Sequence, residues 1–140
     1  MIVVDASVAV KWLVNEISSD QADSLLERNS GEISAPAIFA VEVCAALVPK
    51  ANEVKANRTH SEAGLMKFAA MLEAGIVIVR SSEMPDIADA AKLAMDLGHP
   101  LKDCIYLALA MELGCDLVTC DARFAAKAKG VWAGVRVLGA

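Results

Sequence analysis

The sequence predicts an α/β domain with three layers, in which a parallel sheet lies between helices. Short apolar segments suited to buried strands alternate with longer segments suited to helices along the whole chain. Consecutive parallel strands need a crossover connection of about a dozen residues, which a helix supplies. The length of 140 residues suits one domain, and a hydrophobic share of 56% with only 4% aromatic residues indicates an aliphatic core. We therefore expect a single three-layer α/β/α domain over residues 1–140.

The first half of the chain predicts two strands and three helices. Residues 2–4 are all apolar, as expected of a strand that is buried on both faces. The elements expected after this strand are a helix over residues 6–14, an amphipathic helix over 19–29, a strand over 32–35 that ends at Pro36, and a helix over about 37–49. Residues 53–60 are the most polar stretch, so we expect them to connect two helices.

The second half predicts three further strands and four helices, several of which end at a glycine. Glycine ends helices well because it adopts the left-handed conformation without a steric penalty. The expected elements are helix 61–74 before Gly75, strand 76–79, helix 85–97 before Gly98, helix 104–113 before Gly114, strand 116–120, a short helix around 122–129 and a strand over 135–138.

Charge and hydropathy argue against two broad classes of protein. The net charge of −5 has the wrong sign for a protein that binds nucleic acid through a basic surface alone. The longest apolar stretches, residues 39–48 and 104–113, are too short to cross a membrane and are interrupted by Glu42 and Glu112. The first residues lack the basic start of a secretory signal, so we expect a soluble cytoplasmic protein.

The four cysteines form no CxxC pair, and each stands in an apolar context. Cysteine in such surroundings behaves as a small hydrophobic residue. Only two histidines are available as further zinc ligands, at spacings that do not suit a zinc site. We therefore expect reduced thiols in the core at Cys44, Cys104, Cys115 and Cys120.

Two aspartates stand directly after predicted strands. Asp5 follows the strand over residues 2–4, and Asp121 follows the strand over 116–120. Functional sites of open α/β sheets form beyond the carboxyl ends of the strands, so these two carboxylates lie together if the strands are neighbours. Each aspartate also suits the N-cap of the helix that follows it, a role worth about 1 kcal/mol. Asp103, just ahead of helix 104–113, is equally explicable as a cap.

Glu42 is harder to explain by structure alone. Its neighbours one helical turn away on both sides are apolar, and no basic residue lies within helical reach. A carboxylate in an apolar wall must become neutral, pair with a cation or bind a metal, because burying an isolated charge is costly. If these four acids converge, they repel one another unless a cation is present. Oxygen ligands of this kind suit Mg²⁺ or Mn²⁺, which can activate water beside a phosphate.

The same residues, in the same order, resemble the PIN-domain ribonucleases, and most closely the VapC-type toxins of bacterial toxin–antitoxin pairs. The resemblance spans the whole chain. Its markers are VVDAS at residues 3–7, PAIFAVEV at 36–43, LKDCIYLALA at 101–110 and LVTCD at 117–121.

The resemblance implies a fold, a reaction, a cofactor and partners. It implies a five-stranded parallel sheet between helices and an endoribonuclease that uses Mg²⁺ or Mn²⁺ to cleave RNA. It also implies a homodimer and a cognate antitoxin, for which the helices that begin near Ser19 and Ala37 are candidate binding surfaces. The metal ligands and catalytic residues would be an acidic quartet, which consists of Asp5, Glu42, Asp103 and Asp121. The hydroxyls of Ser7 and Thr119 match polar positions that flank these acids and could support them.

Basic residues close to the acids in the sequence are candidates for contacts with RNA phosphates. They are Lys11, Lys102 and Arg123, although isolated basic residues are most often only solvated surface. We expect Trp12 to lie in the core rather than to stack on a base.

Two other functions share parts of this pattern. A receiver domain or a haloacid-dehalogenase-type phosphatase also combines an α/β fold with Mg²⁺ and aspartate, but both require a second acid near Asp5 that this chain lacks. A non-catalytic RNA-binding module is the other alternative, but it does not explain why Glu42 stands in an apolar helix face. The RNA target does not follow from these residues.

Overall fold

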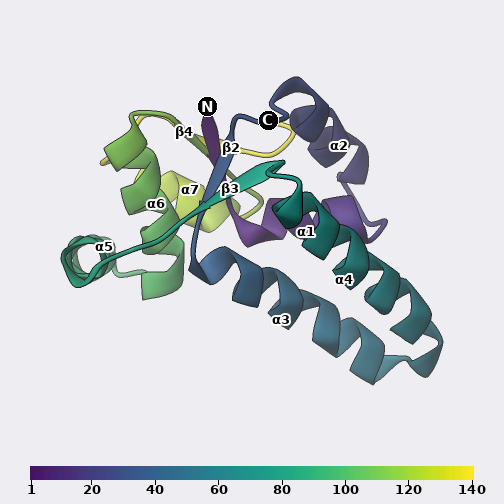
Figure 1. Cartoon of the computed structure of the whole chain (residues 1–140). Helices are drawn as coiled ribbons and strands as arrows, with labels where there is room; N and C mark the ends of the chain where they lie inside the picture. Colours follow the sequence, from purple (N-terminus) through teal and green to yellow (C-terminus); the bar gives the residue numbers. More distant parts are fainter.

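The computed structural model describes residues 1–140 and has a five-stranded sheet with helices on both faces (Figure 1). All the neighbouring strand pairs are parallel. The elements are β1 (Ile2–Val4), α1 (Ala6–Leu13), α2 (Ser19–Arg28), β2 (Ile33–Pro36), α3 (Ile38–Glu53), a 3₁₀ turn (Lys55–Asn57), α4 (Arg58–Glu73), β3 (Val77–Arg80), α5 (Met84–Leu97), α6 (Leu101–Leu113), β4 (Asp116–Thr119), α7 (Ala122–Ala128) and β5 (Val135–Val137). The predicted three-layer α/β/α class is therefore confirmed.

The strand order is β3-β2-β1-β4-β5, so the first strand lies in the middle of the sheet. Val3 pairs with Ser34 of β2 on one side and with Leu117 of β4 on the other. The order of the strands reverses between β1 and β4, which is where open α/β sheets form their sites. A receiver domain has the order 2-1-3-4-5, so the topology argues against that alternative.

The helices pack in two groups against the sheet. Helix α1 contacts α2, α3, α4 and β4, whereas α6 contacts α5, β1, β2 and β4. Figure 1 shows these two groups on different sides of the strands. The buried residues between them are mainly Val, Leu, Ile and Ala, as the composition predicted. Trp12 lies in this core and donates a hydrogen bond from Nε1 to the Ala22 carbonyl at 2.8 Å.

Helix α3 is longer than predicted and runs through Pro49 to Glu53. The prediction that it ends near Pro49 was wrong. A proline inside a helix leaves the carbonyl four residues earlier, here that of Ala45, without its partner. Ala45 and Pro49 are both exposed, so water can bind that carbonyl. The predicted connection over residues 53–60 does join two helices, but it is shorter than expected, since α3 ends at Glu53 and α4 begins at Arg58.

Helix α6 begins three residues before its predicted start, at Leu101, with Pro100 at the N-cap position. The alternative interpretation of Asp103 as the cap of this helix does not hold, because Asp103 lies inside the first turn. The four cysteines are free, and Cys104 is fully buried. None of the helices combines the length and the apolar composition needed to span a membrane.

Candidate active site

Asp5 and Asp121 lie at the carboxyl ends of the two central strands. The Asp5 backbone N–H donates to the Val118 carbonyl at 3.0 Å, which continues the pairing of β1 with β4. Both aspartates also cap helices: Asp5 accepts from the Ser7 N–H at 3.4 Å, and Asp121 accepts from the Phe124 N–H at 3.0 Å. The capping interpretation is thus correct for both residues, and it orients each carboxylate at the strand end.

Thr119 links these two aspartates. Its buried hydroxyl donates to Oδ2 of Asp5 at 2.7 Å and accepts from the backbone N–H of Asp121 at 3.1 Å. The hydroxyl of Ser7 accepts from the backbone N–H of Cys120 at 3.1 Å. The end of β4 is therefore fixed to the start of α1 by both of the hydroxyls that the sequence singled out.

Glu42 reaches this site from α3. Its side chain is only 16% exposed, and the nearest cation is Lys102 of α6, whose Nζ lies 3.8 Å from Oε2. As expected, no basic residue of α3 lies within helical reach of Glu42, and its cation comes from a different helix. Oε1 of Glu42 and the hydroxyl of Tyr106 are both buried, and neither makes a well-formed hydrogen bond.

The acids influence one another through space. Burial raises the pKa of Asp5 above its ordinary value of 3.8; the hydrogen bond from Thr119 offsets part of this rise, and the charge of Asp103 adds to it. Burial also raises the pKa of Glu42 above 4.5, and the charges of Asp5 and Asp103 raise it further. Tyr106 and Lys102 act in the opposite direction. Asp5 and Asp103 therefore act on Glu42 at this end of the sheet.

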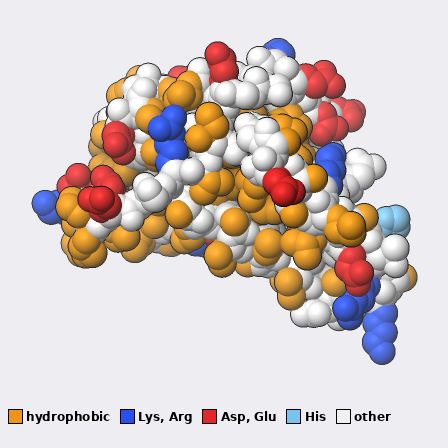
Figure 2. All heavy atoms as spheres, viewed as in Figure 1, with side chains coloured by type: hydrophobic (Ala, Val, Ile, Leu, Met, Phe, Trp, Pro, Cys, Tyr) orange, Lys and Arg blue, Asp and Glu red, His pale blue; other side chains and the backbone are white.

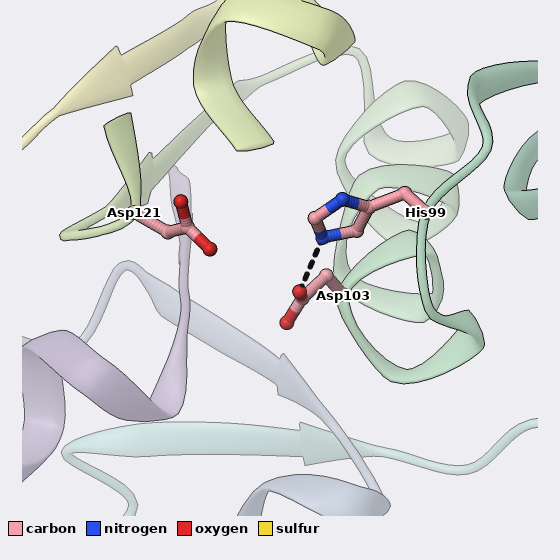
Figure 3. Close-up of side chains that lie close together, drawn as sticks. All are labelled: His99, Asp103 and Asp121. Carbon is pink, nitrogen blue, oxygen red and sulfur yellow. Dashed lines mark hydrogen bonds and ion pairs between the residues drawn. The ribbon is translucent and has the colours of Figure 1, made fainter. Parts of the chain in front are cut away.

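Asp103 and Asp121 face each other across a gap that His99 also borders (Figure 3). The Nε2 atom of His99 lies 2.6 Å from Oδ2 of Asp103. One ligand atom from each of these three residues lies within 4.8 Å of the other two. The structure thus brings all of the acidic quartet to one end of the sheet, from α3, α6 and the ends of β1 and β4.

Sequence reasoning missed two residues of this site, His99 and Tyr106. His99 was considered only as a zinc partner, and it precedes α6 by two residues, so helical spacing did not connect it with Asp103. Tyr106 is fully buried one turn after Asp103. Burial, then the charges of Glu42 and Asp5, hold the pKa of its phenol well above the usual range. The signal in the sequence was a lone tyrosine one helical turn after an acid.

The three basic candidates are placed differently. The ammonium of Lys11 is already bound by Glu16 at 3.2 Å and by the Ile17 carbonyl at 2.7 Å. Lys102 is 61% exposed beside Glu42. Arg123 is exposed two residues after Asp121. Lys102 and Arg123 are therefore better placed than Lys11 to meet a ligand at the acids.

The donor set fits a divalent cation. Four carboxylates provide hard oxygen ligands, and the buried Oε1 of Glu42 makes no well-formed hydrogen bond within the protein. Burial is the main cause of the raised pKa values of Asp5 and Glu42, and repulsion between the acids adds to it; a cation at this place would offset both effects.

A sequence model of the PIN domain family matches residues 2–130. The chain therefore belongs to the PIN domain family, whose members are generally nucleases. The predicted family is thereby confirmed. A comparison with curated proteins finds no match.

Solved structures share this fold. PAE2754 from Pyrobaculum aerophilum matches with a TM-score of 0.70 and 20% sequence identity, over 98% of this chain and 88% of that chain. A toxin–antitoxin complex from Klebsiella pneumoniae matches with a TM-score of 0.69 and 18% identity, over 97% of this chain and 96% of that chain. At these identities, the likeness concerns the fold.

Proposed function

We propose that this chain is a metal-dependent endoribonuclease whose acidic quartet holds Mg²⁺ or Mn²⁺ and hydrolyses RNA phosphodiester bonds. The observation that carries the proposal is the meeting of acids from separate elements at one end of the sheet, where burial, and then the charges of Asp5 and Asp103, raise the pKa of Glu42. Like charges held together out of water destabilise a fold unless they serve a ligand. Membership of a family of nucleases supports the same interpretation.

The residues of the chain prepare the carboxylates for a cation. Thr119 fixes one oxygen of Asp5, and Tyr106 and Lys102 lower the pKa of Glu42 toward the charged form that binds metal. When bound, a divalent ion supplies polarisation of the phosphate and lowers the pKa of water. Lys102 and Arg123 are exposed beside the acids and could contact neighbouring phosphates of the substrate.

Cleavage of an RNA pool by the purified chain tests the reaction. We expect cleavage with Mg²⁺ or Mn²⁺, none with EDTA, and a loss of about a hundredfold or more in Asp5→Asn, by analogy with the loss of a single electrostatic group in other active sites. The matched control is Asp23→Asn, which removes an exposed acid of α2. Equal activity in Asp5→Asn, or cleavage without metal, contradicts the proposal. Since Asp5→Asn is purified in the same way, its loss of cleavage also excludes a contaminating nuclease.

We further propose that this nuclease is the toxin of a toxin–antitoxin pair and acts in the cytoplasm. The support is the shared fold with a toxin–antitoxin complex. Induced expression in a bacterial host is expected to arrest growth, whereas Asp121→Asn at the same protein level leaves growth unchanged. Arrest by both proteins means that RNA cleavage is not the cause.

The candidate surface for an antitoxin is the exposed apolar face of α3 and α4. Figure 2 shows hydrophobic side chains gathered over these helices. Val41 of α3 is 69% exposed, and Val48, Leu65 and Met66 are exposed as well. The exposed face of α2 carries Asp20, Asp23, Glu27 and Arg28 instead, which makes α2 the weaker of the two predicted surfaces. The predicted homodimer is checked by sedimentation, in which we expect twice the mass of one chain.

A further inference from the structure

His99 is held rigidly by the turn between α5 and α6. Gly98 ends α5 in the left-handed conformation with φ 61°, and Pro100 begins α6 immediately after the histidine. The imidazole ring packs against the ring of Phe124, with 4.7 Å between the ring centroids. Nζ of Lys127 donates to the Gly98 carbonyl at 3.0 Å, which fixes the turn to α7. Contacts with the end of α5, the start of α6 and α7 therefore fix the position of the imidazole.

The ring is directed at the gap between two acids rather than at solvent (Figure 3). The side chain of His99 is only 10% exposed, and Asp103 provides its one hydrogen bond. The ligand atoms of His99, Asp103 and Asp121 lie within 4.8 Å of one another. Two ligands on opposite sides of a small divalent ion are about 4.4 Å apart, because each bond measures about 2.0–2.2 Å. These three groups thus need only small side-chain movements to bind one ion.

We propose that His99 is a direct ligand of the metal site, which makes the site a mixed nitrogen and oxygen site with a preference for Mn²⁺ over Mg²⁺. This inference rests on the proposed metal-dependent activity and adds a ligand and a choice of ion to it. Mg²⁺ favours oxygen ligands in a strict octahedron, whereas imidazole suits transition metals. A purely supporting histidine would instead keep its hydrogen bond to Asp103 and never touch the ion.

Pulsed electron paramagnetic resonance of bound Mn²⁺ distinguishes these two arrangements. The probe is Mn²⁺ alone, added below one equivalent to the full chain. In the wild type, we expect the electron spin echo of Mn²⁺ to be modulated by the nitrogen of a directly bound imidazole. Growth with ¹⁵N-labelled histidine should change that modulation, a test that needs no substitution in the protein. The chain contains only two histidines, so His60→Gln is the matched control and must keep the signal, whereas His99→Gln must lose it.

Calorimetric titration gives the second readout. We expect His99→Gln to weaken Mn²⁺ binding by about tenfold or more while Mg²⁺ binding changes little, so that the preference between the ions is lost. Bound Mn²⁺ without nitrogen modulation, combined with normal cleavage of RNA, overturns the inference and leaves the proposed function standing. If the wild type binds neither ion, both fail. His99→Asn repeats the comparison if His99→Gln does not fold.

Discussion

Asp5 has two roles with opposite effects on stability. It caps α1, yet it carries a buried charge whose pKa is raised by burial. Asn caps helices as well as Asp does, so Asp5→Asn removes the charge and keeps the cap. We expect this variant to be more stable than the wild type in EDTA near neutral pH, by on the order of 1 kcal/mol, and to gain nothing from added Mn²⁺. Thermal unfolding with and without the metal checks this; a less stable Asp5→Asn in EDTA contradicts it.

The stability of the metal-free protein should fall as the pH rises. The pKa values of Asp5 and Glu42 are raised in the folded state above 3.8 and 4.5, so folding favours their protonated forms. The stabilisation is complete below these ordinary values and is lost as the pH rises through the raised ones. We expect the free energy of unfolding, measured with urea in EDTA, to fall with rising pH in the wild type relative to the double variant Asp5→Asn and Glu42→Gln. A difference that is independent of pH would show that neither pKa is raised.

The contribution of Tyr106 to the site can be tested by removing its hydroxyl oxygen. Its hydroxyl lowers the pKa of Glu42, so Tyr106→Phe should make Glu42 harder to ionise. Metal then competes with a more tightly held proton, and the pH at which half of the sites bind Mn²⁺ should rise. An unchanged binding midpoint in calorimetric titrations across pH would remove Tyr106 from the site.

At the scale of single elements, α6 shows where sequence patterns stop being informative. The pattern placed its start at Cys104 because an apolar run begins there, directly after Asp103, which suits a cap. The structure instead uses Pro100 at the N-cap, where its fixed φ suits a helix start. This early start places Lys102 beside Glu42, a contact between two helices that spacing along one helix could not reveal.

Pro49 gives a prediction that belongs to α3 alone. It interrupts the hydrogen bonding of a helix that nevertheless continues to Glu53. Pro49→Ala restores a donor for the Ala45 carbonyl and removes the steric conflict of the proline ring. It also increases the conformational entropy of the unfolded chain, which offsets part of the gain. We expect a net gain of about 1 kcal/mol in urea unfolding, with RNA cleavage unchanged because Pro49 lies two turns beyond Glu42. A destabilised variant would mean that the proline is needed to shape the end of α3.

At the scale of the whole molecule, the strand order explains why scattered acids meet. With β1 between β2 and β4, Asp5 lies beside the end of β4, and the helix that follows β2 brings Glu42 to the same end of the sheet. The sequence predicted the class and the strands well, because buried apolar runs and glycine stops are local signals. It left the strand order open, since pairing depends on contacts between distant segments. His99 was missed because it lies before the start of α6, where helical spacing does not connect it with Asp103.

The charge of the whole molecule limits how it can hold RNA. With a net charge of −5 and few basic side chains exposed near the acids, among them Lys102 and Arg123, few phosphates can be neutralised by the protein. Binding of single-stranded RNA loses affinity with salt in proportion to the number of phosphates neutralised, with a slope of about −0.7 for each. We therefore expect a slope no steeper than about −2 for a non-cleavable RNA in Mg²⁺, measured by fluorescence anisotropy over a series of KCl concentrations. Lys102→Ala should make the slope shallower by nearly the amount that corresponds to one phosphate, about 0.7. A slope near −5 would require a broad basic surface elsewhere, and the RNA would then bind away from the acids.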